Sequence, residues 1–353
     1  MAKDVAAAKD CDLVCEGGGV KGIGLAGAYA AVEAAGYRPR RVAGTSAGAI
    51  TAALIAAGYT AAELKEVVLS LDFRQFEDKG WEDRIPGLAN PLSILLDQGI
   101  YEGEKFLQWM REMLAAKDVH TFGHLKTDSD DPRYAYKLQV IVSDISSREL
   151  LVLPRDAAKL GLDPDKLEVA LAVRMSMSIP IFFEPVRIQN PATNWEHVLV
   201  DGGMLSNFPV WLFDCDDEPG WPTFGLLLVE PDPKTPITAR LPAPEHSPRG
   251  AKGVVQLLSG MVHTMMEAHD RMYIEKEQYA RTIGIPTLGV GTTEFQITRE
   301  RAIALYESGE KAGESFLSTW DFDAYIAAFR SGREHSRRDE ITAELKQQTA
   351  APA

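Results

Sequence analysis

Cysteine is scarce in this sequence, with three residues, Cys11, Cys15 and Cys215, among 353. They form no CxxC pair, and no histidine lies near Cys11 or Cys15 in the chain. Three thiols placed in this way exclude a disulfide scaffold and argue against a structural zinc site. We therefore expect buried, reduced cysteines, a reducing compartment and no bound metal.

Positive charge is also in short supply. Lys and Arg number 37 against 51 Asp and Glu, which gives a formal net charge of −14. Proteins that bind nucleic acid need a basic face for the phosphate backbone. No nucleic acid partner is therefore expected for a chain as acidic as this one.

Long apolar runs are missing as well. Residues 1–10 are polar and lack the apolar core of a signal peptide. Residues 42–62 carry no charge and are long enough to span a bilayer, but they consist largely of Ala and Gly interrupted by Thr and Ser. We interpret this stretch as a buried strand, turn and helix, and we expect a cytoplasmic protein.

What remains is the composition of a globular protein, with 45% hydrophobic and 25% charged residues. An apolar strand, a glycine turn and an Ala-rich helix follow one another twice, over 11–36 and 40–57. This alternation predicts an α/β fold with a mostly parallel central sheet. We expect further strands at 134–142, 149–153, 186–200 (a hairpin), 224–230 and 281–290, and further helices at 102–116, 165–177, 251–279 and 299–318.

A glycine-rich segment, GGGVKG at 17–22, lies between the first strand and its helix. Its backbone can approach a ligand closely, and its N–H groups, with the helix N-terminus, attract a phosphate or a developing oxyanion. Two overlapping GxGxxG spacings suggest a dinucleotide site. Such a site needs an acidic residue about 20 positions further on, at the end of the second strand. That strand reads RRVAGTS and carries none, and no GxxxxGK[ST] phosphate loop is present here.

The second strand ends instead in the motif Gly44-Thr45-Ser46-Ala47-Gly48. Small neighbours allow the sharp strand-to-helix turn that presents a nucleophilic serine. The following helix N-terminus stabilises negative charge near Ser46. A plain helix cap is the alternative interpretation, and the glycine loop one strand away favours the nucleophile.

A nucleophilic serine needs a base. The histidines are His120, His124, His197, His246, His263, His269 and His335. None of them follows a strand end in the way that an α/β hydrolase presents its histidine. Asp201 does end a strand, HVLV, and precedes Gly202 and Gly203. Alone, such an aspartate is typical of an Asx turn.

Together, GGGVKG, GTSAG and DGG, in this order after strands, resemble the patatin-like phospholipases. Similar blocks occur at 99–114, 142–153, 176–186 and 201–210. The resemblance covers roughly residues 11–320 and is weaker towards the C-terminal part. It implies a three-layer α/β/α patatin-like fold and an acyl hydrolase that needs no cofactor.

The resemblance also implies roles for particular residues. Ser46 would be the nucleophile, Asp201 its general base in a Ser–Asp dyad without histidine, and Gly17, Gly18 and Gly19 the oxyanion donors. The remaining motif residues would support this site: Lys21, Gly22, Gly44, Gly48, Gly202 and Gly203. The expected partner is a phospholipid or another acyl ester. Contact with a membrane or micelle would be transient, because the negative charge disfavours docking on anionic lipid.

Two alternatives stay open at this point. One is a broad carboxylesterase that acts on short acyl esters with a Ser-His-Asp triad. The other is a phosphate- or nucleotide-binding module that uses the glycine loop without catalysis. The length suggests about two domains, but the motifs run along the chain as one unit. We therefore predict a single domain over 1–330 and a polar tail over 331–353.

Overall fold

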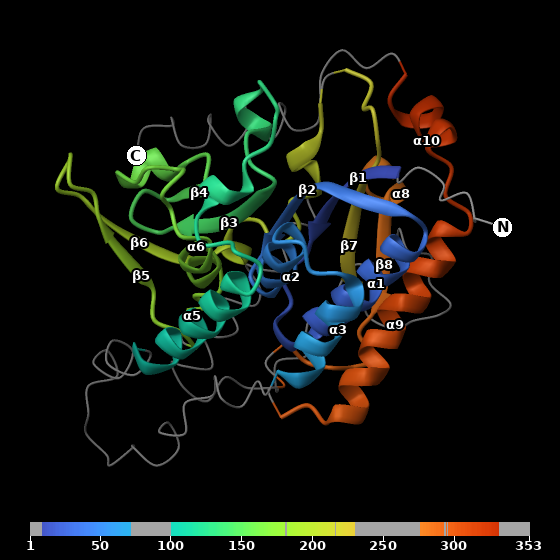
Figure 1. The fold of residues 1–353 in the computed structure, drawn as a ribbon, viewed down its shortest axis with the longest axis horizontal. Coiled ribbons are helices and arrows are strands. Elements are labelled where there is room, and N and C mark those ends of the chain that lie inside the picture. The colour runs from blue at the N-terminus through green and yellow to red at the C-terminus, as the bar shows by residue number, and fades with distance from the viewer. Residues whose placement is uncertain are drawn as a thin grey trace, which may run out of the picture.

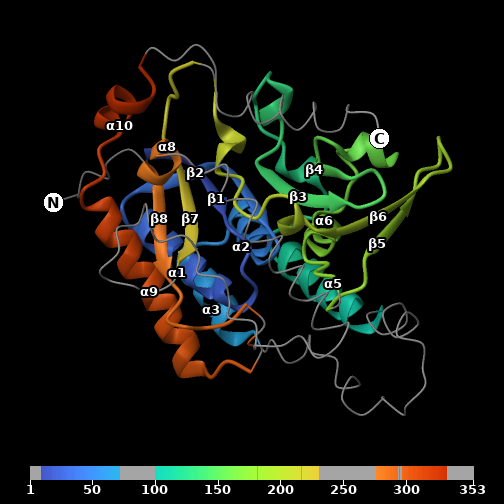
Figure 2. The ribbon, with the colours of Figure 1, turned by 180° about the vertical axis from the view of Figure 1, so that it is seen from behind.

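The computed structural model describes residues 9–71, 100–180, 182–215, 217–229, 276–292, 294 and 296–331. These ranges form a mostly parallel sheet with helices packed on it, seen from opposite sides in Figures 1 and 2. The predicted α/β class is therefore confirmed. Apart from their ends, the segments 71–101 and 251–279 and the predicted tail at 331–353 lie outside the described residues.

The strands are β1 (Lys9–Cys15), β2 (Tyr37–Thr45), β3 (Leu138–Asp144), β4 (Glu149–Leu153), β5 (Val186–Gln189), β6 (Glu196–Asp201), β7 (Thr223–Val229) and β8 (Thr282–Pro286). The helices are α1 (Ile23–Ala34), α2 (Ala47–Ala56), α3 (Ala61–Ser70), α5 (Ile100–Ala115), α6 (Val169–Ser176), α8 (Lys276–Ala280), α9 (Arg299–Leu317) and α10 (Phe322–Phe329). The uncharged stretch 42–62 forms the end of β2, all of α2 and the start of α3. Across the described ranges, no helix has the length and apolar character to cross a membrane.

Some element boundaries differ from the sequence-based expectation for local reasons. The helix expected from residue 165 begins only at Val169, because a turn precedes it in which the Asp163 carboxylate accepts the Asp165 N–H. The strand expected from residue 134 begins at Leu138, since Pro132–Tyr134 form a 3₁₀ turn capped by Asp131. The short helix α10 was not predicted.

The sheet has the strand order β5-β6-β3-β2-β1-β7-β8, and β4 pairs with β3. Strands β2, β1, β7 and β8 run parallel to their neighbours, and β2 is parallel to β3. Parallel strands present their carboxyl ends at one edge of a sheet, where ligands bind in open α/β folds. The glycine loop after β1 and Ser46 after β2 therefore emerge side by side.

The pairing of β3 brings the carboxyl end of another strand, β6, next to the carboxyl end of β2. Its partners β4 and β6 are both antiparallel to it. Because β4 follows one edge of β3 from Val140 to Asp144, β2 and β6 must share the other edge. There β2 ends with Thr45 opposite Ile141, and β6 ends with Asp201 opposite the next residue, Val142. The two strands thus meet end to end.

Alternation of buried side chains along the strands divides the core between the two faces of the sheet. On one face, residues such as Leu13 and Val140 pack with the apolar sides of α1, α2, α5, α6 and α9. On the other face, their neighbours Val14 and Ile141 pack against a segment at 208–213. Strands buried on both faces read as nearly continuous apolar runs, as β7 (TFGLLLV) does.

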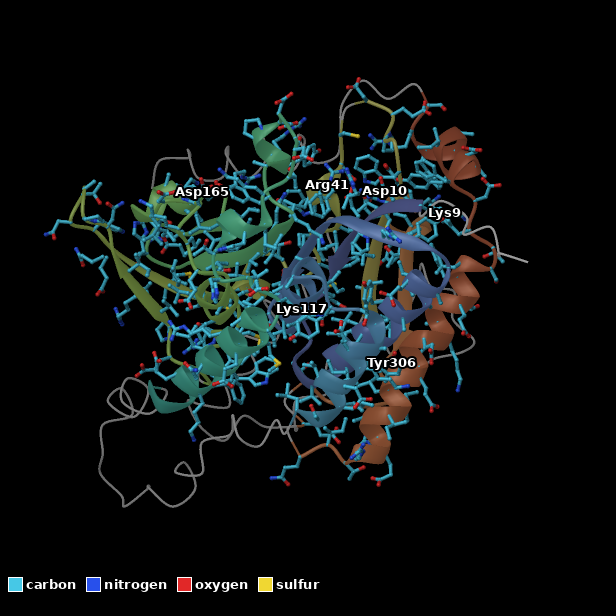
Figure 3. All side chains as sticks on the ribbon, in the orientation of Figure 1. Lys9, Asp10, Arg41, Lys117, Asp165 and Tyr306 are labelled. Carbon is cyan, nitrogen blue, oxygen red and sulfur yellow. The ribbon has the colours of Figure 1, made fainter. Side chains whose placement is uncertain are left out.

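Helix α3 lies between α5 and α9 in Figure 1, and it contacts a residue at each of these neighbours, Lys117 and Tyr306, which are labelled in Figure 3. Lys117, just after α5, forms an ion pair with Glu63 on α3 at 2.7 Å. Lys65 on α3 lies 4.5 Å from the centre of the Tyr306 ring on α9. Exposed contacts of this kind are screened by water and contribute little to stability.

Candidate active site

Ser46 sits at a sharp turn between β2 and α2, with backbone angles φ 53° and ψ −128°. A positive φ is strained for any residue but glycine, and costs on the order of 1–3 kcal/mol. The turn is tight enough that the glycines beside it have no room for a side chain. A Cβ atom on Gly44 would lie 2.3 Å from the carbonyl oxygen of Gly48, and one on Gly48 would lie 2.4 Å from that of Cys15.

The Ser46 hydroxyl donates a hydrogen bond directly to the Asp201 carboxylate, with 2.6 Å between Oγ and Oδ2. Both side chains are fully buried. The second oxygen, Oδ1, accepts the N–H of Gly203 at 2.7 Å. Asp201 therefore makes the Asx turn that its sequence context suggests and also reaches the serine. Gly202 is required here because a Cβ atom would lie 2.3 Å from the Ile141 carbonyl oxygen.

Burial also changes the acidity of this carboxyl group. It raises the pKa of Asp201 from 3.8 to about 7, because desolvation disfavours the charged form. Hydrogen bonds from Ser46 and from the Gly203 N–H act in the opposite direction and are outweighed. A carboxylate with a pKa near neutrality is a stronger base than an exposed one, which is the property needed to take a proton from a hydroxyl.

The glycine loop lies against the serine. A Cβ atom on Gly17 would lie 3.1 Å from the Ser46 Cβ, and one on Gly22 would lie 3.2 Å from the Ala47 Cβ. Gly19 adopts a positive φ of 54° and lies against the Thr292 carbonyl, which also accepts the Val20 N–H. The Gly17 N–H donates to the Asn207 carbonyl at 3.1 Å. Of the three predicted oxyanion glycines, Gly17 thus already uses its donor within the protein.

Lys21, predicted to support the motif, lies half-buried in the 3₁₀ turn Gly19–Gly22. Its backbone N–H donates to the Gly18 carbonyl at 3.1 Å. This bond closes the turn that leads into α1 and keeps the loop compact.

The segment 176–178 touches both halves of the Ser–Asp pair and was not identified from the sequence as part of the site. The Ser176 hydroxyl accepts the Ser46 N–H at 2.8 Å and donates to the Ile141 carbonyl at 2.7 Å. The Met177 sulfur lies 3.7 Å from the Ser46 Oγ. The Ser178 carbonyl accepts the Asp201 N–H at 2.9 Å. The sequence signal for these contacts is the block at 176–186, which begins SMSIP and resembles the family, but it did not indicate what its two serines bind.

Replacing Ser176 with alanine is expected to lower both stability and activity. The change leaves the buried Ser46 N–H without its acceptor, at a cost of about 1–3 kcal/mol, and frees the turn that holds Ser46. Denaturant unfolding and ester hydrolysis measure the two effects. Ser308→Ala is a matched control, because it also removes a hydroxyl that donates to a backbone carbonyl, that of Pro286 at 2.7 Å. If both variants keep full activity, Ser176 does not position the Ser46 side chain for the reaction.

The described histidines lie elsewhere. His197 is buried, with its Nδ1 2.6 Å from Asp144 Oδ2, and His120 and His124 are exposed. Neither the hydroxyl of Ser46 nor the carboxylate of Asp201 bonds a histidine within the parts of the chain described here. The other four histidines lie outside these parts. In the same parts, no three His, Cys, Asp or Glu side chains gather as a metal site would require.

Comparison with known protein families shows to which family the chain belongs. A family model described as patatin-like phospholipase matches residues 13–214, from β1 to just beyond the 208–213 segment. This match includes the glycine loop, the turn at Ser46 and the turn at Asp201. The chain belongs to the patatin-like phospholipase family. Family membership supports lipid hydrolysis as its activity.

Two individual proteins are similar to this chain in sequence. The protein YqhO of Bacillus subtilis is 37% identical over 311 residues, which cover 88% of this chain and 99% of YqhO. A protein of Invertebrate iridescent virus 6, named probable lipid hydrolase 463L, is 26% identical over 213 residues. That alignment covers 56% of this chain and 61% of the viral protein.

Solved structures resemble this patatin-like chain more distantly. VipD from Legionella pneumophila has a TM-score of 0.49 and 16% identity, with 97% of this chain and 74% of VipD covered. ExoU from Pseudomonas aeruginosa, in complex with SpcU, has a TM-score of 0.44 and 18% identity, with 97% of this chain and 59% of the other covered. The family assignment rests on the sequence match alone.

Proposed function

We propose that this protein is a serine lipid acyl hydrolase in which Ser46 and Asp201 form a catalytic dyad. The observation that carries the proposal is the direct hydrogen bond between the Ser46 hydroxyl and the buried Asp201 carboxylate, at 2.6 Å. A plain helix cap does not need a buried acid at this position. The strained backbone of Ser46 also supports a functional role, since strain of this kind gathers at active sites.

The first half of the reaction forms an acyl-enzyme. As Ser46 Oγ attacks the ester carbonyl carbon, its proton passes to Asp201 Oδ2, and the carbonyl oxygen becomes an oxyanion. The bond from the carbonyl carbon to the alcohol oxygen then breaks, and the proton on Asp201 passes to the leaving alcohol or lysolipid. In the second half, Asp201 takes a proton from water, the hydroxide attacks the acyl group, and the proton returns to Ser46 as the fatty acid leaves.

Backbone N–H groups of the glycine loop stabilise the oxyanion in this proposal. Because the Gly17 N–H donates to Asn207, the donors are Gly18 and Gly19. The positive end of α2, which begins at Ala47, adds to the same field. Such donors act mainly on the transition state, and removing one typically lowers the rate about 10²–10³-fold.

The family and one viral relative support the proposed substrate class. The family is described as phospholipase-like and the viral relative is named a probable lipid hydrolase, so we propose phospholipids or lysophospholipids as substrates. Short-chain carboxylic esters are the competing class. A panel of phospholipids and short acyl esters, scored by released acid, separates the two.

Labelling with a fluorophosphonate probe tests the proposed nucleophile. The probe is expected to modify Ser46, as located by mass spectrometry of the labelled peptide, and to leave Ser46→Ala unlabelled. A folded wild-type protein that does not react would contradict the hydrolase and favour a binding module. Each single His→Ala variant is expected to keep most of its activity, whereas one inactive histidine variant would replace the dyad by a triad.

The pH dependence of kcat/KM tests the base. Asp201 accepts a proton only when ionised, and desolvation raises its pKa to about 7. We therefore expect kcat/KM for a non-ionising ester to rise with pH, to reach half its maximum near pH 7 and then to level off, because this parameter reports the free enzyme. A profile that is flat across this range would exclude Asp201 as the base.

A further inference from the structure

Asn207 forms hydrogen bonds with both backbone polar groups of Gly17, its C=O and its N–H. Its side-chain Nδ2 donates to the Gly17 carbonyl at 3.0 Å, and its own carbonyl accepts the Gly17 N–H at 3.1 Å. There is no room for a side chain on Gly17, since a Cβ atom there would lie 2.1 Å from Asn207 Oδ1 and 3.1 Å from the Ser46 Cβ. Gly17 is therefore held between Asn207 and the nucleophile, with both of its backbone polar groups bonded.

Glu16 supports Asn207 from behind. Its buried carboxylate accepts Asn207 Nδ2 on Oε1 at 3.3 Å and the Leu228 N–H on Oε2 at 2.5 Å. The second bond anchors the carboxylate to β7, which continues past the end of β1. A bond to a carboxylate is stronger than one to a neutral acceptor, so Glu16 fixes where the Asn207 amide lies.

The same contacts decide which way the Asn207 amide faces. Nδ2 lies between two acceptors, the Gly17 carbonyl and Glu16 Oε1, so the reversed amide would put an oxygen against both. This orientation leaves the amide oxygen, Oδ1, in an unfavourable position. Oδ1 is buried and accepts no hydrogen bond from the described residues. The two bonds of Nδ2 therefore set the orientation of the amide even though Oδ1 gains no partner among the described residues.

Fixing the Gly17 carbonyl also fixes the donor that follows it. The peptide bond is planar and trans, so the Gly18 N–H points opposite to the Gly17 C=O. We propose that Asn207, supported by Glu16, is a positioning residue that sets the plane of the Gly17–Gly18 peptide and aims the Gly18 N–H at the oxyanion. This inference rests on the proposed Ser–Asp hydrolysis. It means that Asn207 and Glu16, which lie outside the dyad, align the Gly18 N–H that stabilises the transition state.

Steady-state hydrolysis of an acyl ester by the full-length variant Asn207→Ala tests the inference. We expect kcat to fall about tenfold to a hundredfold while KM stays within about twofold, because a misaligned donor weakens transition-state binding but not substrate binding. Glu16→Gln is the second variant. It keeps the shape of the side chain, but a glutamine oxygen on Leu228 leaves an NH₂ group facing the Asn207 NH₂, so kcat is expected to fall in the same direction.

Asn190→Ala is the matched control. Like Asn207, Asn190 donates from Nδ2 to a backbone carbonyl, that of Lys159 at 3.0 Å, but it lies in the β5–β6 turn. This variant is expected to lose stability and to keep its kcat. Thermal unfolding confirms that every variant is folded at the assay temperature. If Asn207→Ala does not fold, Glu16→Gln decides the question by itself.

Two different results separate this inference from the function on which it rests. If Ser46→Ala stays active, the dyad is wrong. If Ser46→Ala is inactive but the folded Asn207 and Glu16 variants keep kcat within about twofold of the wild type, the dyad stands and the positioning role is overturned.

Discussion

Replacing Ser46 with alanine is expected to lower lipid ester hydrolysis by at least about a thousandfold. The hydroxyl is the only group of this residue that can attack a carbonyl carbon, and Asp201 alone would have to activate water without a covalent intermediate. Released fatty acid, measured with a phospholipid or a short-chain ester, gives the result. Activity within about tenfold of the wild type would exclude Ser46 as the nucleophile.

Ser46→Gly is a companion variant, because the backbone conformation at residue 46 predicts that it and Ser46→Ala differ in stability. Both changes remove the hydroxyl, but only glycine adopts φ 53° without strain. The glycine variant is expected to be more stable than the alanine variant by roughly 1 kcal/mol, as measured by denaturant unfolding. Both are expected to be inactive. Equal stability would mean that the turn at residue 46 is not strained.

Replacing Asp201 with asparagine is expected to abolish hydrolysis and at the same time to stabilise the fold. The amide keeps the shape of the side chain: its oxygen can accept the Gly203 N–H, and its NH₂ can donate to Ser46 Oγ, which rotates its own hydrogen away. It cannot take the serine proton. It also removes a charge that burial disfavours. Hydrolysis and thermal unfolding measure the two effects.

The gain in stability should depend on pH in a definite direction. Because the folded pKa of Asp201 is about 7 and the unfolded one is near 3.8, the wild type loses stability as pH rises between these values. Relative to the wild type, Asp201→Asn should therefore show no advantage near pH 4 and its full advantage above about pH 7, with a Tm increase of roughly 2 °C or more. A variant less stable than the wild type at about pH 8 would mean that the carboxylate stabilises the fold.

Short-range features of the fold could be predicted because neighbouring residues decide them. The doubled strand–glycine–helix pattern predicted β1, α1, β2 and α2, and the strand at 149–153 has the expected bounds. The tight turn at Ser46 is only partly local: Gly44 is required by its contact with Gly48 four residues on, whereas Gly48 is required by the carbonyl of Cys15 on the neighbouring strand. Where a local cap competes with the apolar pattern, as Asp131 does before β3, the predicted boundary was wrong.

The sequence by itself was sufficient for the family, for the α/β class and for the serine turn, because these depend on motifs a few residues long. Only the tertiary structure decided how distant parts meet. The Ser46–Asp201 contact depends on two strands that end one residue apart along β3. The contacts of Ser176 with Ser46 and of Asn207 with Gly17 join residues more than a hundred positions apart. Such contacts follow from strand register, which the packing of the whole sheet sets and no local motif records.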